Sequence, residues 1–134
     1  MSLDDVYRRK VEGTINAEMF KVAAKALQAV VSATPVGNPE LWQSKAPAGY
    51  TGGHARRNWQ VDIDTFTPSE VEGKDKSGAT TIAEGVATAK RFNIARHTRV
   101  SLHNSAPYIR RLDEGHSEQA PAGFVSRAVQ AATR

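Results

Sequence analysis

The chain has 134 residues, of which 40% are hydrophobic, and a formal net charge of +4. This length and apolar fraction predict a single domain, residues 1–134, with one core. The lack of cysteine excludes disulfides and thiolate metal sites. The sequence contains no run of about 18 apolar residues, so we expect no membrane span. Asp4 and Asp5 stand where a secretory signal would carry basic residues, so we expect a protein that is made and used without secretion.

The first quarter of the chain predicts a long helix that ends near Ala33. Apolar residues recur there at spacings of three and four, which is the period of a helix with one buried face. Ser2 is placed to cap an early start near Leu3, but Gly13 weakens the pattern, so we expect the helix to begin in earnest near Thr14. The alternative is a stripe that contacts a partner. The predicted core residues of this helix are Met19, Leu27 and Val30.

Residues 35–53 predict a loop that is long for a compact domain. Trp42 and Tyr50 lie in it among polar residues, and aromatic side chains are favoured in the cores of interfaces. We interpret the loop as an arm that contacts a neighbouring subunit, with these two aromatics as its anchors. The alternatives are a surface loop without a partner, or aromatics that fold back on their own domain.

The middle of the chain predicts two strands separated by a helix. Residues 60–66 alternate between apolar and polar side chains, as in a half-buried strand, and residues 98–103 do the same. Between them, residues 70–72 are a candidate short edge strand, and residues 79–92 have the apolar spacing of a helix, which Gly85 weakens. The predicted core residues here are Trp59, Val61, Ile63, Val100 and Leu102.

The stretch from Asn104 to Val125 predicts a short helix, a polar loop and the start of a terminal helix. Pro107 suits the first turn of the short helix, and Gly115 can end it in the left-handed conformation. The predicted core residues of this part are Tyr108, Leu112 and Phe124. Together the elements predict an α+β fold, in which a long N-terminal helix packs on a small, mostly antiparallel sheet, with a second helix, a short helix and a C-terminal helix.

Two blocks of sequence resemble one known family. The first is Thr34-Pro-Val, followed by Thr51-Gly and by Arg57-Asn-Trp-Gln-Val. The second runs between Asn104 and Val125 as Asn-x-x-Pro-Tyr-x-x-x-Leu-x-x-Gly-His-Ser and then Gln-Ala-Pro-x-Gly-Phe-Val. In this order the blocks resemble the tail-completion, or head–tail joining, proteins of long-tailed bacteriophages. The loop 35–53 is longer than the link that this family often has at that place, so it looks like an insertion.

The resemblance implies a structural virion protein, not an enzyme. It implies a ring of copies, with six expected, at the neck between head and tail, made in the host bacterial cytoplasm. The partners would be other copies, the connector or stopper proteins above, the tail tube or tail terminator proteins below, and double-stranded DNA that passes through the lumen without sequence-specific contacts. We expect the ring contacts to come from residues 35–53 and 113–123. The predicted interface residues are Trp42, Tyr50, Arg56, Arg57, Arg110, Arg111, Glu114, His116 and Gln119.

The charges are unevenly spread along the chain. Residues 60–89 carry two Lys/Arg against six Asp/Glu, whereas residues 90–134 carry eight against three. A subunit with one acidic and one basic face would favour head-to-tail contacts between copies, which can close a ring. The alternative is a solvated surface with local bias. A basic face could also line a channel for DNA.

The sequence predicts no catalytic, cofactor or metal site. Its four histidines do not occur in a metal-binding spacing. Asp62 and Asp64 lie two apart on a predicted strand, where a solvated face is the simplest interpretation and a cation or acid–base site the alternative. The alternative function is a small basic nucleic-acid-binding module, for which DNA binding would depend steeply on salt.

Overall fold

The computed structural model describes residues 1–36, 52–107, 109–114 and 122–134. The predicted α+β class is confirmed, with a long N-terminal helix, a two-stranded antiparallel sheet and further short and C-terminal helices. The described residues form these elements in chain order: α1 (Leu3–Ala33), α2 (His54–Arg57), β1 (Trp59–Ile63), α3 (Ala79–Ala89), β2 (Val100–Asn104), α4 (Ile109–Asp113) and α5 (Phe124–Ala132).

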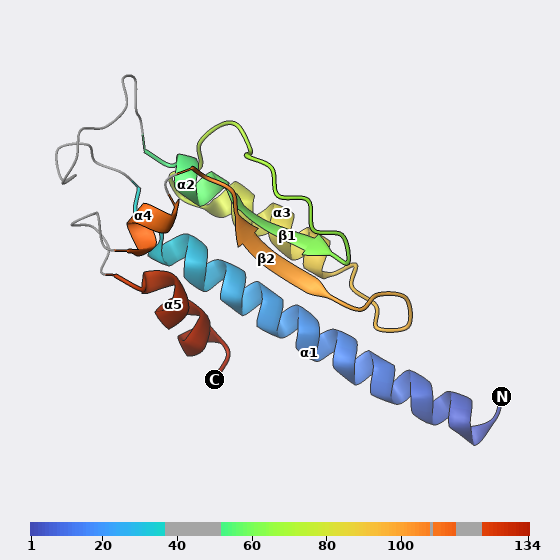
Figure 1. Ribbon diagram of the computed structural model, residues 1–134. Coiled ribbons are helices and arrows are strands. Elements are labelled where there is room, and N and C mark those ends of the chain that lie inside the picture. Colours follow the sequence, from blue (N-terminus) through green and yellow to red (C-terminus); the bar gives the residue numbers. More distant parts are fainter. Residues whose placement is uncertain (37–51, 108, 115–121) are drawn as a thin grey trace.

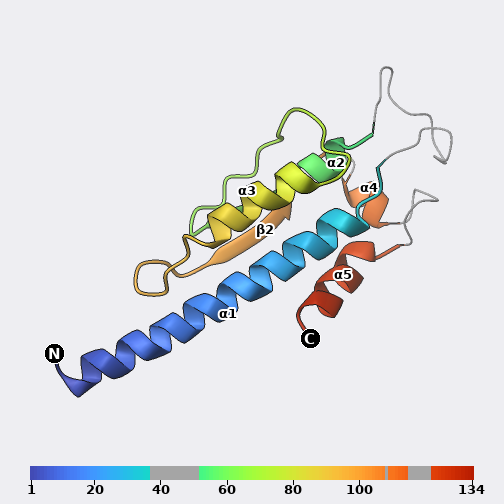
Figure 2. The same ribbon diagram turned by 180° about the vertical axis from the view of Figure 1, so that it is seen from behind.

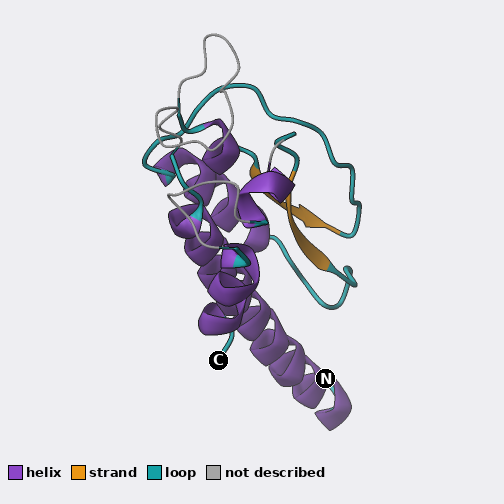
Figure 3. Cartoon of the chain, turned by 60° about the vertical axis from the view of Figure 1, so that its left-hand side comes forward, coloured by secondary structure: helices purple, strands orange, loops and turns teal. Residues whose placement is uncertain are grey.

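The sheet lies on a layer of helices, as Figure 3 shows. Strands β1 and β2 pair antiparallel, with Val61 opposite Leu102. Helix α1 lies between α3 and α5, and α2 and α4 gather around its C-terminal end (Figure 1, Figure 2). The N-terminal turns of α1 project past all the other elements (Figure 1). Only the second half of α1 therefore packs in the core.

Helix α1 begins at its cap rather than near Thr14. The Ser2 Oγ accepts a bond of 3.2 Å from the Asp5 N–H, and the Asp5 carboxylate reaches back to the Ser2 N–H, so both ends of a capping box are present. The expected late start is wrong, because the single interior glycine, Gly13, costs too little to break a capped helix of 31 residues. The predicted end is confirmed, since Thr34 is extended (φ −71°, ψ 123°) before Pro35.

Two clusters of buried side chains form the core. The larger joins α1, β1 and α3, and the smaller joins α2, α4 and α5 near the end of α1. Of the predicted core residues, six are buried: Leu27, Val30, Trp59, Val61, Leu112 and Phe124. Four are only half-buried: Met19, Ile63, Val100 and Leu102. Of these four, Val100 and Leu102 pack against the larger cluster, and Tyr108 lies outside the described residues.

Several predicted boundaries also change. The first strand ends at Ile63 instead of residue 66, because Asp64 takes a left-handed conformation (φ 60°). Residues 70–72 form no strand, and α3 ends at Ala89 instead of residue 92. The second strand is shifted to Val100–Asn104. Elements are thus shorter than the apolar patterns suggested.

Gly85 sets how closely α3 approaches α1. A Cβ built on it would lie 2.3 Å from Leu27 Cδ2 and 3.2 Å from Val61 Cγ2. Because Leu27 is fully buried, its side chain has little room to move away. The glycine that weakened the sequence pattern is therefore the residue that lets α3 pack on α1 and β1.

Substitution of Gly85 by Ala should lower the free energy of unfolding by about 1–3 kcal/mol, because the added methyl overpacks the core. Gly13→Ala is the matched control, since nothing lies within 4 Å of its Cβ position in the same kind of helix interior. We expect Gly13→Ala to raise the free energy of unfolding by about 0.5–1 kcal/mol. Urea unfolding of both variants measures this, and equal effects at the two sites would contradict the close packing at Gly85.

The Trp59 indole ties β1 to the end of α1. Its Nε1–H donates to the Thr34 Oγ1 at 2.7 Å, and that hydroxyl donates in turn to the Val30 carbonyl at 2.6 Å. Both Trp59 and Thr34 are buried. The hydroxyl is thus satisfied as donor and as acceptor where water has no access.

Trp59→Ala should reduce the free energy of unfolding by about 3–5 kcal/mol, because it removes a buried ring and leaves a cavity. Trp59→Phe keeps most of the apolar contact and removes only the N–H, so its loss should be clearly smaller. Chemical denaturation compares the two variants. A loss below about 1 kcal/mol for Trp59→Ala would show that the ring does not support the core.

Candidate functional site

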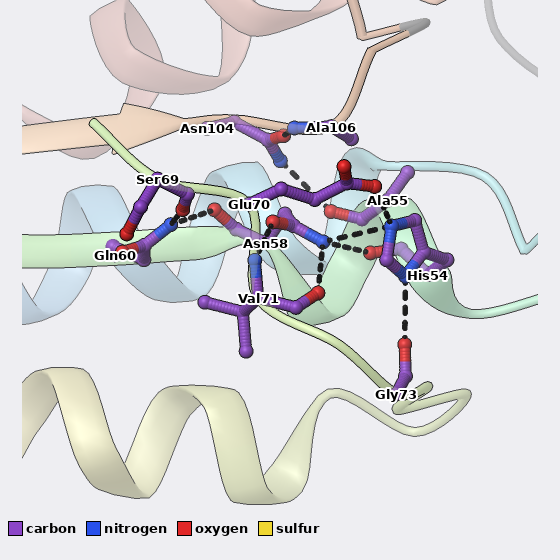
Figure 4. Close-up of polar contacts among 10 residues, drawn as sticks. All are labelled: His54, Ala55, Asn58, Gln60, Ser69, Glu70, Val71, Gly73, Asn104 and Ala106. Atoms are coloured by element: carbon purple, nitrogen blue, oxygen red, sulfur yellow. Dashed lines mark hydrogen bonds and ion pairs between the residues drawn. The ribbon is translucent and has the colours of Figure 1, made fainter.

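The segment that follows β1 is fastened to the sheet by side chains. The buried Asn58 accepts the Val71 N–H at 2.7 Å and donates to the Val71 carbonyl at 3.0 Å (Figure 4). Gln60 Nε2 donates to the Ser69 carbonyl at 2.9 Å. Residues 69–71 therefore run beside β1 without forming a ladder with it, which explains why the apolar pattern there gives no strand.

His54 extends this fastening to the end of the segment. Its Nδ1 lies 2.8 Å from the Gly73 carbonyl and its Nε2 lies 2.7 Å from the Glu70 carboxylate (Figure 4). These two partners are acceptors, and the Asn58 amide nitrogen, a donor, lies 3.3 Å from the same Nε2. The geometry gives His54 a structural role, with no open position toward a substrate.

A second contact between a histidine and a carboxylate lies on the outer face of the sheet. His103 Nε2 is 2.6 Å from the Asp62 carboxylate, and the Phe66 ring stands edge-on to the imidazole at 4.8 Å. The His103 Nδ1 is buried and has no hydrogen-bond partner among the described residues. Asp62 therefore keeps a side chain that is 34% exposed and also contacts His103 across the two strands.

Asp64 does not share a site with Asp62. It lies past the end of β1, where its Oδ1 accepts the N–H groups of Thr98 at 2.7 Å and Arg99 at 3.0 Å. The Thr98 N–H is the main reason that the pKa of Asp64 lies below its ordinary value of 3.8. Among the described residues, no group of three or more His, Asp or Glu is arranged to hold a metal ion.

The two sequence blocks meet at one end of the molecule. The Asn104 side chain donates to the Ala55 carbonyl at 2.8 Å and accepts the Ala106 N–H at 2.9 Å (Figure 4). Ala55 and Ala106 then pack with Leu112 and Phe124 in the smaller core cluster. The motif residues that the structure describes thus hold α2, β2, α4 and α5 together.

Arg56 and Arg57 also make their contacts within the chain. Arg56 donates to the carbonyls of Ser32, Thr34 and Lys76, and so ties the end of α1 to the turn before α3. Arg57 forms an ion pair with Glu84 at 2.8 Å. The Arg56 guanidinium is thus bound by three carbonyls, and Arg57 has an intrachain partner as well. The interface role expected for both stays a prediction.

The other predicted interface residues fall in two groups. Arg110 and Glu114 are exposed at α4. Trp42, Tyr50, His116 and Gln119 lie outside the described residues, as does the side chain of Arg111. The arm at 35–53 and the contact at 113–123 stay predictions.

The structure also has an apolar groove on its surface. It has a volume of about 310 Å³ and lies between α1, the inner face of the sheet and α5. Val100 and Leu102 form the wall on the β2 side, and Val125 and Val129 form the wall on α5. The floor comes from α1 and includes Met19, Val22, Ala23 and Ala26. Val22 is 40% exposed at the mouth, so the groove is open to solvent.

The groove runs along the open edge of β2. The Asp64 N–H donates to the Arg99 carbonyl. In an antiparallel pair every second residue bonds to the partner strand, so the backbone groups of residues 101 and 103 also point toward β1. The backbone groups of Val100 and Leu102 therefore point to the other edge, where the described part of the chain supplies no strand. An apolar groove beside an open strand edge can receive an extended segment.

A comparison of the chain with protein-family models, curated proteins and solved structures finds no match. The described residues include no helix that is both long and apolar enough to cross a membrane. The interpretation of the site therefore depends on its own geometry. The groove and the strand edge were not predicted from the sequence. The signal that it held was the presence of apolar residues on more than one side of α1, such as Val11 and Val22.

The Asp64 carboxylate should contribute to stability in a pH-dependent way. Because its folded-state pKa is lowered, the contribution is present above the ordinary value of 3.8 and is lost as pH falls through the lower folded-state pKa. Asp64→Asn keeps a side-chain oxygen and tolerates positive φ, so it removes mainly the charge. We expect wild type to be more stable than the variant at pH 7, and the difference to shrink toward pH 2. Urea unfolding across this range tests it, and a difference that grows on acidification would contradict the assignment.

Proposed function

We propose that this protein is a structural subunit of a tailed-phage particle, which assembles into a ring at the neck and joins the head to the tail. The observation that carries the proposal is the apolar surface that the described residues leave open: the groove beside β2 and the projecting half of α1. Soluble proteins that act alone rarely expose connected apolar surfaces of this kind. Assembly is the function that such surfaces support best.

The projecting half of α1 supports an assembly role. Leu3 and Tyr7 are 87% and 71% exposed, and Val11 and Ile15 continue the same stripe at steps of four residues toward the groove. Because Leu3 and Tyr7 stay largely in contact with water, they contribute little to the stability of the isolated subunit. Burial against a neighbour or a connector protein would remove their apolar area from water.

The sequence resemblance supports the neck in particular. Its described residues fall on positions that build the fold, such as Asn104, Leu112 and Trp59, rather than on an open polar site. A family whose shared residues maintain a shape suits a protein that works by assembly. On this proposal the ring has six copies, the connector or stopper lies above it, and the tail tube or tail terminator lies below.

The charges suit a ring through which DNA passes. Residues 90–112, which include β2, carry six Lys/Arg and no Asp/Glu. Part of this basic stretch can face the lumen, where phosphate contacts carry no sequence information. The protein would be part of the virion, made in the host bacterial cytoplasm.

Deletion of this protein from the phage that encodes it should yield DNA-filled heads and separate tails. Addition of the purified protein to that lysate should restore joined, infectious particles, because the ring supplies the missing contact between the two. Electron microscopy and plaque counts measure both outcomes. Complete particles in the absence of the protein would contradict the proposal. Steeply salt-dependent DNA binding by the purified protein would then favour a nucleic-acid-binding module.

A further inference from the structure

We propose that the groove beside β2 receives the segment Thr65–Glu72 of a second copy of this chain, with Phe66 inserted between β2 and α5. The inference rests on the proposed ring and names the two surfaces through which its subunits meet. The contact is heterologous, because the groove of one copy meets a different surface of the next. It would make the acidic part of one subunit face the basic part of its neighbour.

The receiving surface has both apolar and polar components. Val100 and Leu102 direct their side chains into the groove and their backbone groups toward the open edge. Val22 and Met19 continue the apolar surface along α1, and Val129 closes it from α5. An extended segment laid along this edge can place an apolar side chain in the groove and pair its backbone with β2.

The inserted segment is exposed on the opposite edge of the sheet. Residues 65–70 are exposed, and Phe66, whose ring stands edge-on to His103 of its own chain, still leaves 48% of its surface to solvent. The bonds from Gln60 and Asn58 hold Ser69 and Val71 on the side facing their own β1, so the other side of the segment is directed outward. Pro68 has no N–H, so backbone pairing with β2 is limited to residues on either side of it.

Charge complementarity selects a second copy as the occupant. Residues 62–75 carry five Asp/Glu and one Lys, whereas residues 90–112 carry only basic groups. Four of the five acids also make contacts within their own chain, and these are Asp62, Asp64, Glu70 and Asp75. Arg96 and Arg99 are exposed in the loop that leads into β2, and Glu72 is exposed at the end of the inserted segment. Opposite charges on the two surfaces favour this pairing and disfavour like surfaces meeting.

The arrangement on one subunit allows the contact to repeat. The inserted segment runs beside β1 and the groove lies beside β2, at the two opposite edges of the sheet (Figure 1). Each copy therefore offers one surface of each kind to two different neighbours. Such contacts produce rings when the rotation closes.

The test uses two variants that each remove one surface of the contact. Phe66→Asp places a charge on the inserted segment, and Val22→Glu places a charge at the mouth of the groove, at a position that tolerates helix formers. Burial of an unpaired carboxylate is costly, so each variant alone should associate about tenfold or more weakly than wild type. An equimolar mixture should form a single dimer, because each variant retains the surface that the other lacks.

Sedimentation velocity over a range of concentrations measures these masses. Gln28→Glu is the matched control, since Gln28 is exposed on the same helix but does not line the groove. Phe66→Leu is the control for the inserted segment. Both controls should associate as wild type does, and circular dichroism should show the same helical content in all variants.

Three results would overturn the contact. These are wild-type protein that stays monomeric at every concentration, association that neither variant weakens, or a mixture of the two variants that forms no dimer. Complementation of the deleted phage separates this failure from that of the neck role. If Val22→Glu joins heads to tails normally, the neck role stands and the contact is wrong. If wild type is monomeric and Val22→Glu fails to join them, the groove binds a different protein.

Discussion

The close packing of α1 against α3 at Gly85 is the constraint on which the rest of the structure depends. A side chain at that position would meet Leu27 and Val61, so the glycine allows α3 to lie directly on α1 and on the β1 side of the sheet. Helix α3 therefore packs against β1, while α5 lies along α1 on its other side. Between α5 and β2 the described residues leave Val100 and Leu102 of the inner face only half-buried, and the groove is the result.

A two-stranded sheet cannot cover its own edges. The β1 edge is lined by residues 65–73, which Asn58, Gln60 and His54 hold through side-chain bonds. The β2 edge has no such cover among the described residues, and its apolar side chains face the groove. The subunit thus has one covered edge rich in acids and one open edge in a basic stretch. This asymmetry is what a head-to-tail assembly requires.

Most of the architecture could be predicted from the sequence, but the functional surfaces could not. The period of α1 and the alternation of β1 and β2 are local signals, and they placed Leu27, Val61 and Trp59 in the core. The close approach at Gly85 involves Leu27, which lies 58 positions earlier in the chain. The local pattern therefore indicated only that the glycine weakens the helix. Likewise, nothing local shows that Asn58 would hold Val71, or that Asp62 would find His103 across the sheet.

Hydrogen–deuterium exchange at β2 tests the central claim most directly. The outward N–H groups of Val100 and Leu102 should exchange rapidly in dilute, dissociated protein and become protected in the assembled form, because the neighbouring segment covers the edge. The inward N–H groups of Ser101 and His103 serve as internal references, since β1 protects them in both forms. Equal and rapid exchange at Val100 and Leu102 before and after assembly would contradict the account, because the open edge would then take no part in it.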